Sequence, residues 1–174
     1  MKKSEWRVRL GGEPDRDLLA SFTCADPAVP FQAEVEQFCQ RQLLDWALAP
    51  GAAEDDPRLL LLVVTATGDL IGVAAHERKS LHGPSGAPFN ATVLEVIALA
   101  TKWQGRSFES GERASDVLMS AVMVDVASRV PPRDAHVLAV VHEENERSLG
   151  LLRRHGLTQE MSRPAPEYRR FVTP

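Results

Sequence analysis

The sequence predicts an α/β protein in which a mixed sheet carries helices on both faces. Apolar runs of strand length alternate along the chain with longer stretches whose apolar residues recur every three or four positions. Their order is β-α-α-β-β-β-α-β-α-β-β, and such an alternation is typical of a sheet between helical layers. No internal repeat interrupts it, and the 174 residues fit one domain, residues 1–174.

The N-terminal half contains the first three strands and two helices. Strands are expected at residues 6–10, 58–66 and 70–76, and helices at residues 15–22 and 31–48. Each helical stretch carries its apolar residues on one side. Thr67-Gly68-Asp69 is a hairpin signal between two of the strands. Residues 81–90 contain two glycines and two prolines, so we expect a loop there.

The C-terminal half contains a strong helix and several extended segments. Buried strands are expected at residues 93–100 and 137–141, and a helix at residues 112–130, which Pro131 and Pro132 end. Two short extended pieces follow at residues 157–162 and 167–172. The continuous apolar residues of the strands at 93–100 and 137–141 predict that both strands are buried in the sheet.

Residues 135–157 form the most informative segment. The strand at 137–141 leads through Asn145 into an amphipathic helix expected at 143–155, and Gly156 is the residue expected just past a helix end. Acidic side chains stand in the first turn of this helix and basic ones in the last, which complements the helix dipole.

The composition is that of an ordinary soluble protein. It is 44% hydrophobic and 25% charged, with 20 basic and 24 acidic residues and a net charge of −4. This balance disfavours a nucleic-acid-coating protein. No apolar run is long enough to span a bilayer, and no secretory signal follows the basic start, so we expect no membrane association and a cytoplasmic location.

The metal-binding side chains show no pattern typical of a site. None of the five histidines has zinc-like spacing to cysteine or acidic residues, so no metal is expected. Cys24 and Cys39 are interpreted as reduced thiols of the core, although the sequence does not exclude a disulfide between them.

The order Asn145, Ser148, Leu151–Leu152, Gly156–Leu157 resembles the C-terminal signature of the GNAT superfamily of acyl-CoA-dependent N-acetyltransferases. In that signature an Asn, a small residue, an apolar–Tyr pair and a Gly-Phe stand at this spacing. The resemblance implies a mostly antiparallel sheet, acetyl-CoA as co-substrate and direct acetyl transfer to a primary amine.

The resemblance also implies where acetyl-CoA binds. In the GNAT fold the strand that corresponds to residues 93–100 splays from the next one, and the pantetheine arm adds to its free backbone groups. The backbones of Leu99, Ala100 and Thr101 would bind pantetheine, and the amide of Leu99 could polarise the thioester carbonyl. Without the flanking motifs, the same strand would be interpreted simply as a core strand.

Glu95 interrupts the otherwise apolar strand. A carboxylate in a buried strand is costly unless it is paired or reaches water. A Glu with this relation to the following apolar run is the general base in the histone-acetyltransferase branch, which makes Glu95 the candidate that deprotonates the amine. The alternative is a carboxylate that faces solvent or forms a structural ion pair.

The segment that should bind the CoA pyrophosphate departs from the family pattern Gln/Arg-x-x-Gly-x-Gly/Ala. Gln104, Gly105 and Arg106 begin like it, but Ser107 stands at the first Gly position and the loop is longer than usual. A remodelled loop could bind phosphate through Gly105, Gly111 and nearby amides, with Arg106 or Arg113 as charge partners. Weakened or lost CoA binding is the alternative.

The usual general acid is missing from the C-terminal signature. Leu152 stands where the family commonly has the Tyr that protonates the CoA thiolate, and the candidates to replace it are Ser148, Tyr168 and His142. Ser148 and Leu152 would still border the cofactor. Asn145 would hold the pantetheine through its amide, or else cap the helix.

The function expected from these features is acetyl transfer from acetyl-CoA to a primary amine of a small molecule or a protein. The first alternative is a GNAT-fold acyl-CoA-binding or interaction module that has lost catalysis. A weaker alternative is a toxin-like enzyme that acetylates aminoacyl-tRNA, against which the net charge counts. The acceptor is left open, as is the oligomeric state, with a homodimer possible.

Overall fold

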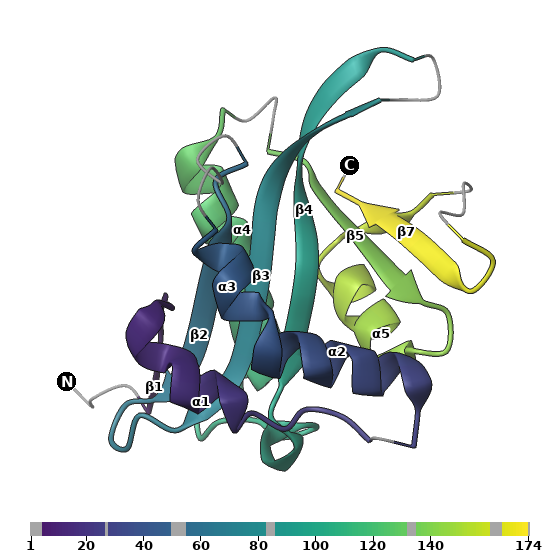
Figure 1. The fold of residues 1–174 in the computed structure, drawn as a ribbon. Coiled ribbons are helices and arrows are strands. Elements are labelled where there is room, and N and C mark those ends of the chain that lie inside the picture. The colour runs from purple at the N-terminus through teal and green to yellow at the C-terminus, as the bar shows by residue number, and fades with distance from the viewer. Residues whose placement is uncertain are drawn as a thin grey trace.

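The computed structural model describes residues 5–26, 28–49, 55–82, 86–131, 135–160 and 165–173. Its sheet has seven strands in the order β1-β2-β3-β4-β5-β7-β6 (Figure 1). The strands are β1 (Trp6–Leu10), β2 (Arg58–Val64), β3 (Leu70–His82), β4 (Pro88–Leu99), β5 (Val137–His142), β6 (Thr158–Gln159) and β7 (Tyr168–Val172). The helices are α1 (Arg16–Ala20), α2 (Pro30–Arg41), α3 (Leu43–Ala47), α4 (Ala114–Arg129) and α5 (Glu146–Arg154), with short 3-10 turns at Glu13–Asp15 and Thr101–Trp103.

The predicted fold class is confirmed, and the strands and helices follow the predicted order except that three helices, not two, lie between β1 and β2. Neighbouring strands are antiparallel except β4 and β5, which are parallel. Helices α1 to α3 cover one face of the sheet, and α4 and α5 cover the other. Gly156 has the positive φ of 80° expected of the residue that follows a helix.

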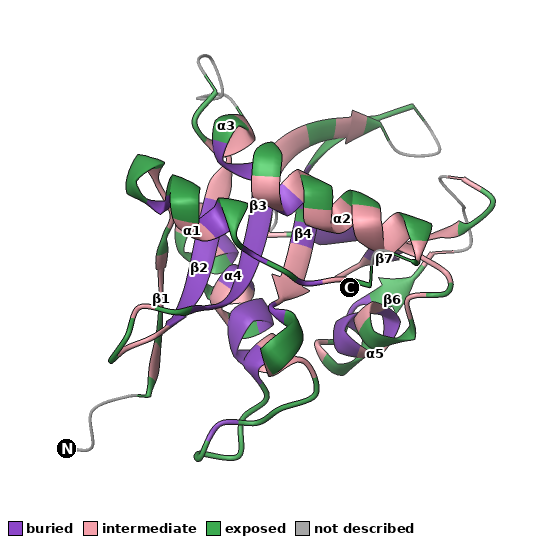
Figure 2. Ribbon diagram, turned by 60° about the horizontal axis from the view of Figure 1, so that its bottom comes forward, coloured by how far each residue is buried: buried purple, intermediate pink, exposed green. Residues whose placement is uncertain are grey.

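The continuous apolar run of β2 is explained by burial on both faces. Leu60 and Leu62 join the cluster under α4 and α5. Leu59, Leu61 and Val63 join the cluster under α1 to α3. Because side chains alternate along a strand, both faces of a central strand must be apolar when helices cover both. Figure 2 shows this burial on β2 and β3.

The long helix expected at residues 31–48 is two helices. It breaks at Gln42, whose φ of −117° leaves the regular helical range. The break turns α3 so that Leu43 and Leu44 are buried in the cluster beneath it. Cys24 and Cys39 are free thiols buried in the same cluster.

The prediction of a loop at residues 81–90 is wrong at both ends of this range. Leu81 pairs with Phe89 and His82 with Pro88, so β3 and β4 continue as a hairpin arm. Residues 83–85 lie outside the described part. Pro88 is compatible with the arm because it is the first residue of its strand, where a backbone donor can be spared.

Helix α5 starts later than the charge pattern predicts. Glu143 and Glu144 belong to the turn before the helix, and only Glu146 lies in its first turn. Asn145 is the N-cap, because its side chain accepts a hydrogen bond from the N–H of Ser148. A strong local capping group therefore fixes the helix start.

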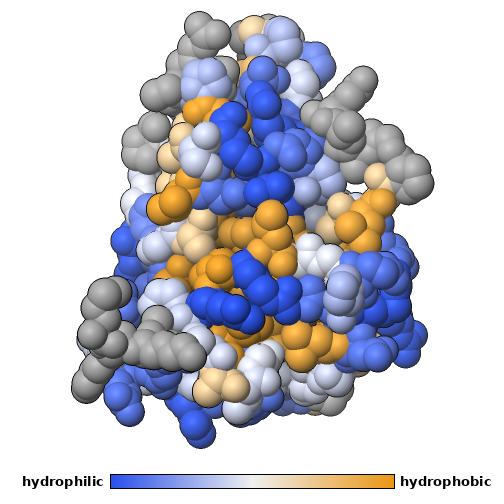
Figure 3. Space-filling view, turned by 90° about the vertical axis from the view of Figure 1, so that its left-hand side faces the viewer, coloured by the Kyte–Doolittle hydropathy of each residue, from blue (hydrophilic) through white to orange (hydrophobic). Residues whose placement is uncertain are grey.

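The β1 edge of the sheet is seen face-on in Figure 3, where apolar surface lies between hydrophilic groups. Leu10, at the end of β1, is 50% exposed. Among the described residues, no helix has the length and apolar content needed to cross a membrane.

Candidate functional site

The site is built around an irregularity in β4. Leu94 pairs with His76 and Val96 with Ala75, so Glu95 is an extra residue that forms a β-bulge. The parallel pairing of β4 with β5 covers only Thr92, Val93 and Leu94. The two strands are therefore unpaired from the bulge onward.

The bulge decides which backbone groups of β4 face β5. In an antiparallel pair, successive residues point their N–H and C=O groups alternately to the partner and away from it. The N–H of Ala100 donates to the carbonyl of Ile71 at 2.8 Å, on the β3 side. The N–H groups of Ile97 and Leu99 consequently point to the unpaired side, as the sequence analysis expected for Leu99.

The other two predicted pantetheine-binding residues offer no free N–H there. The Ala100 amide is engaged by Ile71, and the Thr101 amide donates to the carbonyl of Thr23 at 2.8 Å. Both residues instead line a separate surface pocket beside α1. Of the three predicted backbones, the geometry therefore leaves Leu99 as the donor to the gap.

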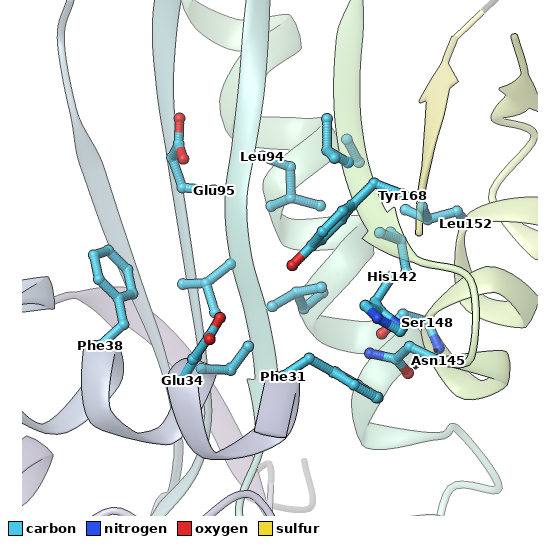
Figure 4. A pocket seen from close by; sticks show the side chains of 16 residues that line it. Phe31, Glu34, Phe38, Leu94, Glu95, His142, Asn145, Ser148, Leu152 and Tyr168 are labelled. Atoms are coloured by element: carbon cyan, nitrogen blue, oxygen red, sulfur yellow. Dashed lines mark hydrogen bonds between the residues drawn. The ribbon is translucent and has the colours of Figure 1, made fainter. Parts of the chain in front are cut away.

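A pocket of about 320 Å³ opens where β4 and β5 part (Figure 4). Side chains from α2, β4, β5, α5 and β7 line it. They are Phe31, Glu34, Val35, Phe38, Leu94, Glu95, Val96, Ile97, Ala139, Val140, Val141, His142, Asn145, Ser148, Leu152 and Tyr168. The lining thus brings together the predicted residues Glu95, Asn145, Ser148 and Leu152, together with the acid candidates His142 and Tyr168.

Three rings in contact, those of Phe31, His142 and Tyr168, form one wall of the pocket. Phe31 of α2 stacks on His142 with ring centroids 4.4 Å apart and an interplanar angle of 8°. Tyr168 meets His142 edge-on at 5.3 Å. The Tyr168 hydroxyl points into the pocket in Figure 4. The Nδ1 atom of His142 lies 3.3 Å from the N–H of Glu144 and accepts its hydrogen bond.

Glu95 lies at the rim and has a partner. The Nζ of Lys79 donates to its Oε1 at 2.8 Å, and Lys79 also pairs with Glu77. Glu95 retains 29% side-chain exposure, so the carboxylate reaches both Lys79 and solvent. Glu95 therefore forms the ion pair that the sequence left open as an alternative, and its carboxylate also lines the pocket.

Glu34 is a second carboxylate that the sequence analysis did not single out. It is exposed on α2, and its side chain has no hydrogen bond or ion pair with the described residues. Its position in sequence carries no signal, because an acidic residue on an amphipathic helix ordinarily faces solvent. Only the packing of α2 across the β4–β5 gap makes it a pocket residue.

The side chain of Gln104 links three separate segments of the chain by hydrogen bonds. Its Nε2 donates to the carbonyls of Cys24, at 2.6 Å, and Leu99, at 3.1 Å. Its Oε1 accepts from Nη1 of Arg147 at 2.6 Å. This side chain joins the end of β4, the segment before α2, and α5, so its amide is already occupied.

The loop between β4 and α4 is anchored by Phe108. This ring is 5% exposed and packs between Trp6 and Trp103, at centroid distances of 5.5 and 5.7 Å. Ser107 and Arg113 form a β-bridge across the loop. The extra length therefore folds into a tight turn that returns the chain to the start of α4.

The two glycines of this loop adopt the positive φ angles that its turns require. Gly105 and Gly111 have φ values of 72° and 87°, and a Cβ added at either would meet nothing within 4 Å. Arg106 and Arg113 are exposed, with no side-chain hydrogen bond or ion pair among the described residues. With the N-terminal amides of α4, they are the groups in this loop that could hold a pyrophosphate.

The N-terminal part of α5 borders the pocket from below. Asn145 Oδ1 accepts from the Ser148 N–H at 3.2 Å, and the Asn145 amide NH2 makes no hydrogen bond to any other described residue. Ser148 is half-buried and Leu152 is 1% exposed. The capping role of Asn145 is thus observed, and it is compatible with a contact to pantetheine through the NH2 group.

Helix α5 is held against α4 by an ion pair. Arg154 donates to Asp116 at 2.8 Å, and His155 lies 3.3 Å from the same carboxylate. Burial opposes ionisation of Asp116, but the hydrogen bonds from Arg154 and His155 outweigh it and hold its pKa below the ordinary value. Among the described residues, no cluster of His, Cys, Asp and Glu could hold a metal ion.

Comparisons with known proteins support the fold through solved structures alone. No protein-family model and no curated protein matches the sequence. Solved structures match over nearly the whole chain. An acetyltransferase of the GNAT family from Staphylococcus aureus is 8% identical, with a TM-score of 0.62 and coverage of 97% of this chain and 98% of that one.

One of the matching structures is a complex with coenzyme A, and another is a complex with acetyl-CoA. The paiA N-acetyltransferase from Thermoplasma acidophilum in complex with coenzyme A is 13% identical, with a TM-score of 0.66 and coverage of 98% and 99%. A mutant of the AtaT toxin bound to the C-terminus of the antitoxin AtaR and acetyl-CoA is 14% identical, with a TM-score of 0.64 and coverage of 98% and 94%. At these identities the likeness shows the fold, which is that of the GNAT acetyltransferases.

Proposed function

We propose that this chain, which has the GNAT acetyltransferase fold, transfers the acetyl group of acetyl-CoA directly to a primary amine. The observation that carries the proposal is the bulged β4, whose Ile97 and Leu99 amides face an unpaired gap that opens into a pocket with two carboxylates. A cytoplasmic location is part of the same proposal.

The backbone of β4 has two tasks in this mechanism. Ile97 lines the pocket, whereas Leu99 does not, so the Ile97 N–H, in place of the Leu99 N–H expected from the sequence, would donate to the thioester carbonyl, where negative charge develops. Leu99 lies two residues on, about 6.6 Å along the strand. Its N–H would bind the pantetheine arm as an added strand does.

The reaction begins with a proton transfer. Glu95 would take a proton from the ammonium form of the acceptor, directly or through water, so that the nitrogen lone pair becomes available. The nitrogen attacks the carbonyl carbon, and a C–N bond forms. The C–S bond then breaks, and its electron pair leaves on sulfur. The nitrogen loses its second proton to solvent as the intermediate collapses, so the products are an amide, the CoA thiolate and a proton.

Tyr168 is the best placed group to protonate the thiolate. Its hydroxyl points into the pocket, while Leu152, at the usual Tyr position, has no proton to give. Ser148 and His142 also line the pocket. A phenol is the stronger candidate because it donates a proton without first having to be charged.

The diphosphate of CoA would lie at the start of α4. Arg106 and Arg113 are the available cations, and the helix N-terminus supplies free N–H groups and a favourable dipole. Gln104 is excluded from direct phosphate binding by its three hydrogen bonds, so it would act by holding Leu99 and α5 in place.

A nucleic-acid acceptor is not favoured. Three of the arginines near the C-terminal end are paired with carboxylates: Arg154 with Asp116, Arg169 with Glu143 and Arg170 with Glu160. These pairs remove much of the basic surface that a tRNA backbone would need.

Acetyl-CoA binding measured by calorimetry, together with thiol release in the presence of a panel of amines, tests the proposal. Binding in the micromolar range and amine-dependent thiol release are expected. Glu95→Gln should lower turnover without changing acetyl-CoA affinity. No binding at millimolar acetyl-CoA would exclude the enzyme.

Binding without turnover would favour the second candidate, an acyl-CoA-binding module that has lost catalysis. Two observations favour this candidate: Glu95 is held by Lys79, and Leu152 replaces the usual acid. In that case the unaltered protein would show no acetyl transfer, and Glu95→Gln would leave acetyl-CoA affinity unchanged.

A further inference from the structure

The charged side chains that line the pocket between β4 and β5 are acidic. The sixteen described residues that line it include Glu34 and Glu95 and no Lys or Arg. Lys79, which contacts Glu95, is also paired with Glu77. An acceptor that carried a carboxylate or phosphate would therefore meet like charge and no counter-charge.

The face that α2 presents to the pocket is regular. Phe31, Glu34, Val35 and Phe38 follow one another at helical spacing, so they lie on one side of the helix. Glu34 consequently stands between two phenyl rings one turn away on either side. Figure 4 shows its carboxylate raised from α2 towards β4, inside the pocket.

The remaining lining is apolar, apart from Asn145 and Ser148 at the start of α5 and the rings of His142 and Tyr168. The side chains of Leu94, Val96, Ile97, Ala139 and Val140 cover the sheet side of the pocket. Apolar walls with a few placed polar groups bind an apolar body and fix its orientation. Carboxylates next to aromatic faces attract an ammonium group through both charge and cation–π interaction.

We infer that the acceptor is a small primary amine with an apolar alkyl or aryl body and no carboxylate or phosphate beside the amine. This inference rests on the proposed acetyl transfer and adds the substrate class to it. Glu34 is the specificity-determining residue. It attracts the ammonium form and brings it between α2 and β4, where Glu95 removes the proton that acetylation requires.

A matched pair of acceptors tests the inference. Phenylethylamine and phenylalanine differ by one carboxylate, and phenylalaninamide keeps a substituent of similar size without the charge. We expect kcat/KM for phenylethylamine and phenylalaninamide to exceed that for phenylalanine by at least about tenfold. The carboxylate of phenylalanine would lie near Glu34 and Glu95 with no cation to pair with it. Hexylamine should also be accepted, since the body need only be apolar.

Variants of two acidic residues test whether Glu34 causes the discrimination against phenylalanine. Glu34→Gln should raise the KM for phenylethylamine about fivefold to tenfold, as expected for loss of one charged contact. It should leave acetyl-CoA affinity unchanged and reduce the discrimination against phenylalanine. Asp17→Asn removes an equal charge from an exposed position on α1 outside the pocket and should change neither value.

Direct binding separates this inference from the proposed function. Calorimetry of each amine with the CoA-loaded protein reports the acceptor preference without turnover. Preference for phenylalanine, or equal phenylethylamine affinity in Glu34→Gln and the unaltered protein, would overturn the substrate class even if acetylation occurs. Selective amine binding without any acetylation would support the substrate class and reject the enzyme.

Discussion

The phenyl ring of Phe31 lies flat on the imidazole of His142, with centroids 4.4 Å apart. Phe31 is the second residue of α2, and His142 is the last residue of β5. The stack therefore fixes the helix that carries Glu34 to the strand that borders the gap. Tyr168, from β7, completes the wall from the other side.

Replacement of Phe31 by Leu should weaken acceptor binding. The change retains an apolar side chain but removes a ring pair worth about 0.5–1.5 kcal/mol, so the KM for the amine should rise about twofold to tenfold. Acetyl-CoA affinity measured by calorimetry should stay the same. A fall in acetyl-CoA affinity with unchanged amine KM would contradict this account of the wall.

Replacement of Tyr168 by Phe should slow turnover. The ring that contacts His142 is kept and only the hydroxyl is lost, so kcat for thiol release should fall about tenfold to a hundredfold, at the low end for acid catalysis because a thiolate leaves readily. The KM values should change little. Unchanged kcat would show that another group or water protonates the thiolate.

Two variants of Asn145 separate its two roles. Asn145→Ala should lower the free energy of unfolding by about 1 kcal/mol through loss of the helix cap. Asn145→Asp should keep that stability, because a carboxylate also caps, but should weaken acetyl-CoA binding about threefold to tenfold, since it has no N–H to donate. Denaturant unfolding and calorimetry measure the two effects. Unchanged acetyl-CoA affinity in the Asp variant would limit Asn145 to capping.

Arg113→Gln should distinguish the phosphate site from the pantetheine site. An exposed charge-assisted contact at the start of α4 is worth about 0.5–1.5 kcal/mol, so acetyl-CoA affinity should fall about twofold to tenfold. Acetyl-pantetheine lacks the pyrophosphate, so its affinity should not change. An equal loss for both ligands would mean that the loop acts on the pocket as a whole.

Stability should decrease as pH falls from about 6.5 to about 4. Burial of His76 under α4 lowers the pKa of His76 to about 4, although Asp125 lies 3.1 Å from its Nε2. In this window the unfolded chain binds a proton at His76 that the folded chain does not, so acid favours unfolding. Denaturant unfolding at pH 7 and pH 4.5 should show a smaller difference in His76→Gln. An identical pH dependence in that variant would assign the effect to other groups.

The sequence by itself determined the order of the elements and the faces that they bury. The alternating leucines of β2 and the C-terminal Gly156 follow from periodicity and from the conformational freedom of glycine, which are local properties. The spacing of Asn145, Ser148 and Leu152 likewise depends only on the turn of one helix. All three residues line the pocket for that reason.

Only the tertiary structure decided which groups are available to the proposed reaction. The bulge at Glu95 reverses the direction of the following amides, and a register shift depends on the partner strand, which the sequence of β4 does not contain. Gln104 is bound by three distant groups, and Glu34 reaches the pocket because α2 crosses the gap. Contacts between segments far apart in the chain have no local sequence signal, so the acceptor side of the site could be found only in the folded protein.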